Sequence, residues 1–256
     1  MARPFLAIAV LLALAPAVAS PAFAQSSLAE RLQSERLGAA RTGTYQAGDH
    51  ITFMLDRDGA HYLLRFAGDP EIFVLYADHT ALGGRVLKYD TNQSVLGVAG
   101  WGAITLYTAN NPNGLPATRI GDSTPPAAPD VSLDALMQAA SDEAEHLAYT
   151  DHLAISFSTD WNGLAADPGL RALCFDTIEN TGRGLERFAA SPAGAHVLKG
   201  RVNAVLVQTS GRPTLQLRNG QLIVTYDPSQ GYAGRASSRA IAHALGTIFG
   251  LKAAQN

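Results

Sequence analysis

The stretch "SVLGVAGWGAITLYT", Ser94 to Thr108, places glycines at positions 97, 100 and 102 around Trp101. A glycine-rich loop that holds a phosphate must lead into a helix, because the free N–H groups of the first helical turn bind the anion. Here the glycines precede "AITLYT", which is rich in strand-forming residues, and no lysine follows them. We therefore predict β-structure, with the glycines at a bulge, bend or close backbone approach and Trp101 as a core or mouth residue at a barrel corner.

The segments before this stretch repeat the same pattern. Short apolar runs such as "HITFMLD", "AHYLLRF" and "EIFVLYA" are separated by turn residues, and the turns recur roughly every ten residues. Within one run, Tyr62, Leu64 and Phe66 share a face while His61, Leu63 and Arg65 share the other. This spacing predicts an antiparallel β-meander, closed into a small barrel or folded as a roll.

The second half of the chain predicts helices mixed with strands. A helix begins after Ser132, another follows Pro168, and "VNAVLVQ" is a strand. Asn219 and Gly220 form a type I′ turn between two more strands, and "SSRAIAHALGTIFG" closes the chain as a helix. The fold class is α+β, with these parts: a signal peptide (1–24), an N-terminal helix (25–44), a β-rich domain (45–109), a proline-rich linker (110–130) and an α+β domain (131–256).

The N-terminus has the features of a secretory signal. Arg3 precedes an apolar run from Phe5 to Val18, and the small residues of "AFA" end at Ala24. The apolar run is shorter than the roughly 20 residues that span a bilayer. We expect cleavage before Gln25, release into a bacterial periplasm, and no stable membrane insertion afterwards, since no later segment is long and apolar enough.

The motifs "YLLRF", "EIFVLYAD", "LGGRVLKYD", "AGWG", "LYT" and "GLPA" lie between Tyr62 and Ala117. Together they resemble a family of exported Gram-negative bacterial proteins of unknown function. The resemblance implies a bacterial, exported protein. It implies no activity, cofactor or catalytic residue.

Composition and motifs exclude several classes of function. The formal net charge is −3 and basic runs are absent, which argues against nucleic acid as a partner. The chain contains no G-x-S-x-G, S-x-x-K or H-E-x-x-H motif. Cys174 is the single cysteine, so one chain cannot form a disulfide or a thiolate zinc cluster, and its apolar neighbours predict a buried side chain. No cofactor and no catalytic residue is predicted.

Two sets of candidate site residues remain. Glu143 and His146 are three residues apart on a predicted helix, which is the spacing found in di-iron bundles. Together with His152, which follows soon after, they are the metal candidates. A solvated acidic helix end explains these residues as well. The ligand-binding candidates are aromatic residues on or beside neighbouring predicted strands, and core packing is their alternative role: Tyr76, Tyr89, Trp101 and Tyr107.

These observations favour a periplasmic binding or interaction module of the cell envelope, whose ligand or protein partner the sequence does not specify. The alternative is a cell-envelope hydrolase with an Asp/Glu/His site that has no sequence signature, because the separation of two catalytic carboxylates depends on the fold. A structural component of the envelope is a third hypothesis.

Overall fold

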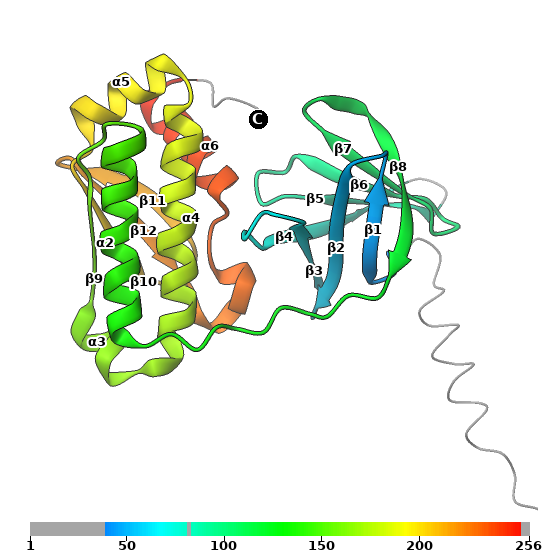
Figure 1. The fold of residues 1–256 in the computed structure, drawn as a ribbon, viewed down its shortest axis with the longest axis horizontal. Coiled ribbons are helices and arrows are strands. Elements are labelled where there is room, and N and C mark those ends of the chain that lie inside the picture. The colour runs from blue at the N-terminus through cyan, green and yellow to red at the C-terminus, as the bar shows by residue number, and fades with distance from the viewer. Residues whose placement is uncertain (1–38, 81–82, 252–256) are drawn as a thin grey trace, which may run out of the picture. The chain divides into compact units, whose positions relative to one another are not determined.

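The computed structural model describes residues 39–80 and 83–251 (Figure 1). The predicted signal peptide and most of the predicted N-terminal helix lie outside these residues. The described residues belong to one compact unit, which contains a β-barrel followed by a sheet covered with helices. The predicted fold class, an antiparallel meander followed by an α+β unit, is confirmed.

Eight antiparallel strands form the barrel in chain order, and the pairing of β1 with β8 closes it. The strands are β1 (Gly43–Ala47), β2 (Ile51–Asp58), β3 (His61–Phe66), β4 (Phe73–His79), β5 (Arg85–Lys88), β6 (Ser94–Val98), β7 (Ile104–Thr108) and β8 (Asn111–Gly121).

The barrel forms because its strands alternate between an inward apolar face and an outward face. Phe53 and Leu55 of β2 and Leu64 of β3 are fully buried, and the ring of Tyr45 stacks on Phe53 with centroids 5.3 Å apart. Burying one such side chain stabilises the fold by about 1.5–3 kcal/mol. The interior is therefore a packed hydrophobic core.

The ends of the barrel correct two predicted boundaries. Gly43 and Thr44, predicted to end the N-terminal helix, belong to β1, and most of the first half of the predicted 110–130 linker is β8. Prolines suggested a linker, but Pro116 lies where β8 is paired with β7 and not yet with β1. A strand tolerates proline where one side has no partner.

The segment from Ser94 to Thr108 is β-structure, as predicted, and forms a hairpin of β6 and β7. Residues 99–103 form the turn between β6 and β7, where Ala99 N–H donates to the carbonyl of Ala103. Gly102 adopts a φ of +90°, which a residue without a side chain reaches easily. Trp101 is 86% exposed at the tip, so its predicted place in the core is wrong.

Residues 122–131, here called the strap, connect the barrel to the second part of the chain. Ser123 Oγ donates to Asp56 Oδ1 at 2.5 Å, and Arg65 bonds both Asp56 and the carbonyl of Thr124. Asp56 is buried on β2. The strap is thus fixed to the barrel at its beginning.

The second part is a four-stranded sheet with helices packed against it. Its strands, in the order β11-β12-β10-β9, are parallel except for the edge strand β11. The predicted type I′ turn between β11 and β12 is confirmed by positive φ at Asn219 and Gly220. The elements are α2 (Leu133–Thr150), β9 (Ser156–Thr159), α3 (Trp161–Ala166), η2 (Pro168–Leu170), α4 (Arg171–Ala189), α5 (Pro192–Arg201), β10 (Ala204–Thr209), β11 (Thr214–Arg218), β12 (Gln221–Tyr226), η3 (Pro228–Gly234) and α6 (Ser238–Phe249).

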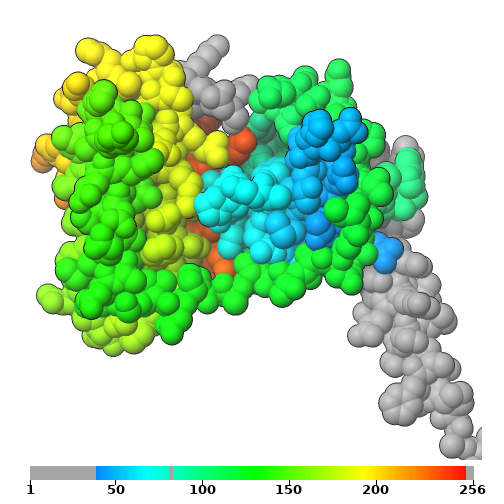
Figure 2. Space-filling model, viewed as in Figure 1, coloured from blue at the N-terminus to red at the C-terminus, as the bar shows by residue number. Residues whose placement is uncertain are grey.

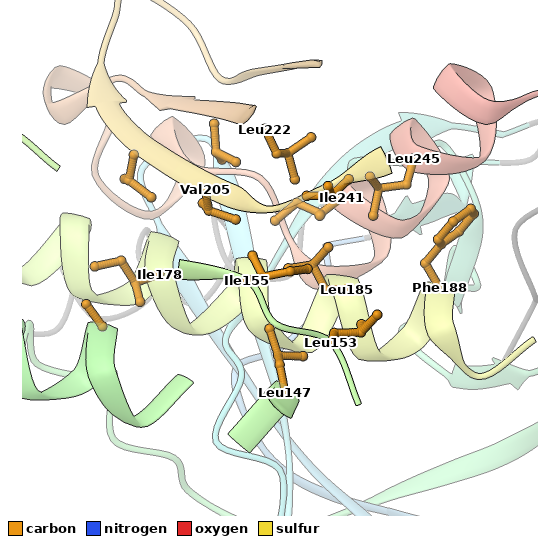
Figure 3. Packing of buried hydrophobic residues seen from close by; sticks show 14 of the residues in the cluster. Leu147, Leu153, Ile155, Ile178, Leu185, Phe188, Val205, Leu222, Ile241 and Leu245 are labelled. Carbon is orange, nitrogen blue, oxygen red and sulfur yellow. The ribbon is translucent and has the colours of Figure 1, made fainter. Parts of the chain in front are cut away.

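A second hydrophobic core lies between this sheet and the helices. Figure 3 shows Val205 and Leu222 from the sheet near Ile178 and Leu185 of α4 and Ile241 of α6, and all five are buried. Cys174 lies in the same core, as predicted. Burial raises the pKa of its thiol, which leaves the thiol unreactive.

Side chains from the barrel bind the N-terminus of α6. Ser237 N–H donates to Asp90, and Ser238 N–H donates to Glu71 Oε1, each at 2.8 Å. The two serine hydroxyls donate to the same carboxyl groups, and Arg187 of α4 donates to Ser238 Oγ. The cyan part of the barrel therefore lies against α4 and α6 in Figure 2.

Among the described residues, no helix is both long and apolar enough to cross a membrane.

Candidate functional site

An open groove of about 400 Å³ lies between α2 and α4, the green and yellow helices in Figure 2. Its lining is polar, with three residues from each helix. On each helix these residues are three or four positions apart or adjacent, which places them on one side of the helix. The lining residues are Asp142, Glu143 and His146 of α2 and Glu179, Arg183 and Glu186 of α4.

Two side-chain pairs order the polar lining of the groove. His146 Nε2 lies 2.5 Å from Glu186 Oε1, which joins the two helices. Arg183 Nη2 lies 2.6 Å from Glu179 Oε2, so the guanidinium is already paired within α4. Both pairs are partly exposed to solvent, and each contributes little to stability.

Glu143 differs from the other acidic residues of the groove. Its carboxyl is half-buried, lies against the backbone of Gly182, and makes no hydrogen bond within the described part of the chain. Burial is the main cause that raises the pKa of Glu143 to about 7, and repulsion from the carboxyl groups of Glu179 and Glu186 raises it further. The positive charges of Arg183 and His146 lower this pKa, but by less. Near neutral pH this carboxyl therefore exchanges a proton readily.

The groove carries an excess of negative charge. Four carboxyl groups line it against one guanidinium, which Glu179 already neutralises, and one imidazole. Such a surface attracts organic cations. An ammonium or guanidinium group can donate charge-assisted N–H hydrogen bonds to the carboxylates. Among the residues that the structure describes, no group of three or more His, Cys, Asp or Glu side chains is arranged to hold a metal ion.

Two of the three metal candidates lie in this groove. Glu143 and His146 share one face of α2, as their spacing predicted. His152 lies in the turn after α2, where it is exposed with a φ of +56° and does not line the groove.

The four aromatic candidates lie in four different surroundings. Tyr89 is buried between Phe73, with ring centroids 5.2 Å apart, and the guanidinium of Arg239, and burial raises the pKa of Tyr89 to about 12. The Tyr107 ring lies against Gly97 and Gly114 of the neighbouring strands. Tyr76 packs edge-on against His61, and Trp101 is at the tip of the β6–β7 hairpin.

Sequence reasoning missed the half of the groove that α4 provides. Glu179, Arg183 and Glu186 follow each other at spacings of four and three residues, which is one face of a helix. A charged face of this kind usually contacts only solvent. The unusual signal is Gly182, a glycine within the same face of a long helix.

Comparisons with curated proteins and with solved structures gave no match. A family model described as a domain of unknown function (DUF4908) matches residues 25–245, and the chain therefore belongs to this family.

Proposed function

We propose that this chain is an exported binding protein of the bacterial cell envelope and that the α2–α4 groove binds a small organic cation. The observation that carries this proposal is the convergence of Asp142, Glu143, Glu179 and Glu186 on one open groove with a single guanidinium among them. The chemical class of the ligand is an amine or guanidine.

The charges of the groove explain why a cation would bind. Crowded carboxyl groups repel each other, and the groove relieves part of this repulsion by keeping a proton on Glu143 near neutral pH, where burial and repulsion hold its pKa at about 7. An ammonium group would replace that proton and bridge several carboxylates. The groove is open, so its ligand keeps contact with solvent and the expected affinity is moderate.

Isothermal titration calorimetry with putrescine and spermidine tests the proposal, with the uncharged diol of the same length as putrescine as a negative control. The double variant Asp142→Asn/Glu143→Gln should weaken amine binding by at least about tenfold, because each charge-assisted hydrogen bond contributes about 1.5–3 kcal/mol. Glu145→Gln is the matched control, since Glu145 is exposed on the same helix and does not line the groove. Absence of amine binding, or equal losses in the double variant and the control, would contradict the proposal.

Export is supported by the N-terminal sequence, in which a basic start, an apolar run and small residues precede Gln25. Intact-mass analysis of the protein from the periplasmic fraction should show a chain that begins at Gln25. A chain that keeps residues 1–24, or that stays in the cytoplasmic fraction, would contradict export.

A second candidate function is hydrolysis of cell-envelope material. The observation that favours it is the pKa of Glu143 at about 7 beside the His146–Glu186 pair, since an acid with a pKa near the working pH is an effective proton donor. Release of soluble fragments from purified peptidoglycan, lost in Glu143→Gln and kept in Glu145→Gln, would favour the hydrolase over the binding protein.

A further inference from the structure

Gly182 is an unexpected residue in the middle of α4. It is buried, and it lies three residues after Glu179 and four residues before Glu186, on the face that lines the groove. Glycine is the least favourable residue in a helix interior apart from proline, so a glycine there needs a reason.

The two glycines inside α4, Gly182 and Gly184, have close neighbours of different kinds. A Cβ added at Gly184 would lie 2.5 Å from Ile241 Cγ2 and 3.1 Å from the Ser238 carbonyl oxygen, so close packing of α4 on α6 requires that glycine. A Cβ added at Gly182 would overlap Glu143 Oε2 and lie 2.6 Å from Glu143 Cδ. The three atoms nearest to it all belong to the flexible end of Glu143, not to the core or the backbone.

We propose that Gly182 is a positioning residue for the groove, whose missing side chain gives the Glu143 carboxyl its place against the backbone of α4. In that place the carboxyl is partly shielded from water and near Glu179, Arg183 and Glu186 of α4 and His146 of its own helix. The part of this inference that concerns ligand affinity rests on the proposed function of the groove. The part that concerns the Glu143 carboxyl does not.

Alanine at position 182 should move the Glu143 carboxyl without harming the fold. The new methyl group occupies the space of the carboxyl, whose side chain rotates toward solvent. Water then shields the charge, so the pKa of Glu143 falls toward its ordinary value of 4.5. The helix itself benefits, because alanine favours helices more than glycine does.

The experiment compares three glycine-to-alanine variants of the full chain: Gly182→Ala, Gly184→Ala, and Gly200→Ala in α5, where an added Cβ meets nothing within 4 Å. Carboxyl carbon NMR, with the Glu143 signal assigned by its loss in Glu143→Gln, gives the titration midpoint without any ligand. We expect a midpoint near pH 7 in the wild type and in Gly200→Ala, and a midpoint below pH 6 in Gly182→Ala. The melting temperature of Gly182→Ala should not fall, whereas that of Gly184→Ala should.

The proposal is overturned by an ordinary midpoint in the wild type, by an unchanged midpoint in Gly182→Ala, or by a melting temperature of Gly182→Ala that falls as far as that of Gly184→Ala. If the midpoint moves as expected but putrescine binds neither protein, Gly182 is a positioning residue and only the proposed cation binding is refuted. If the wild type binds putrescine, Gly182→Ala should bind it at least about tenfold more weakly.

Discussion

Glu143 is a groove residue whose charged carboxylate is disfavoured both by burial and by neighbouring carboxyl groups. Burial, reinforced by Glu179 and Glu186, holds its pKa at about 7, although Arg183 and His146 attract its charge. When a carboxyl group has a higher pKa in the folded chain than in the unfolded chain, its contribution to the free energy of unfolding is fully present below the unfolded pKa. That contribution is lost as the pH rises through the folded pKa. For Glu143 that window extends from about pH 4.5 to about pH 7.

The variant Glu143→Gln should therefore gain stability relative to the wild type as the pH rises from 5 to 8. One pKa unit corresponds to about 1.4 kcal/mol, and solvent screens this partly exposed carboxyl, so we expect a change of about 1–2 kcal/mol across the range. Urea denaturation at several pH values measures it. Glu145→Gln, an exposed control on α2, should show no such trend. A stability difference that is the same at pH 5 and pH 8 would refute this account of Glu143.

The sequence allowed one side of the groove to be predicted and not the other. Glu143 and His146 are neighbours on one helix, and their spacing alone places them together. Their partners on α4 are 33 or more residues further along the chain, and only the packing of α2 on α4 brings Glu179 and Glu186 to them. The aromatic candidates had no such local constraint, since a strand residue can face the core, the solvent or a neighbouring part of the fold.

At the level of elements, the sequence predicted a small barrel or roll, but it did not identify β1 and β8, the two strands whose pairing closes the barrel. Asn219 and Gly220 specify their turn by themselves, so the β11–β12 hairpin was predicted with its turn type. β1 and β8 pair only with each other and with one neighbour each, and about 70 residues separate them in the chain. Nothing local marks the short β1, and the prolines of β8 suggested a linker.

Two substitutions in the β6–β7 hairpin test whether Gly102 or Trp101 contributes more to the free energy of unfolding. Gly102 has a φ of +90° and open space around its missing Cβ, so Gly102→Val should destabilise the protein through backbone strain alone, by about 1–3 kcal/mol. Trp101→Ser removes a side chain that is 86% exposed and should change stability by less than about 0.5 kcal/mol. Thermal and urea denaturation of both variants measure the difference. A larger loss in Trp101→Ser than in Gly102→Val would show that the indole packs against the fold.

On the scale of the whole molecule, the family match covers both the barrel and the helix-covered sheet. The matched range, residues 25–245, begins at the predicted start of the mature chain and ends within α6. The predicted membership of a family of unknown function is thus confirmed, and the match extends well beyond the residues of the original resemblance. The family model therefore spans both parts of this chain.

The barrel and α6 are joined by carboxyl groups whose role no local pattern revealed. Glu71 and Asp90 lie in barrel loops, 167 and 147 residues before the serines that they bind. Ser237 and Ser238 begin α6, where free N–H groups need acceptors and negative charge is favourable. The sequence showed a helix start at this point but not that the acceptors come from the barrel.

These contacts should make the two parts unfold together. In differential scanning calorimetry we expect one transition for the wild type. The variant Glu71→Ala/Asp90→Ala leaves the N–H and hydroxyl groups of Ser237 and Ser238 without their acceptors, at a cost of about 1–3 kcal/mol for each buried group. The variant should melt at a lower temperature and in two transitions, because each part keeps its own hydrophobic core. Asp78→Ala is the control, since that barrel carboxylate is largely exposed and pairs with Lys88 at the surface. Two transitions already present in the wild type, or equal effects of the double variant and the control, would mean that Glu71 and Asp90 do not couple the barrel to α6.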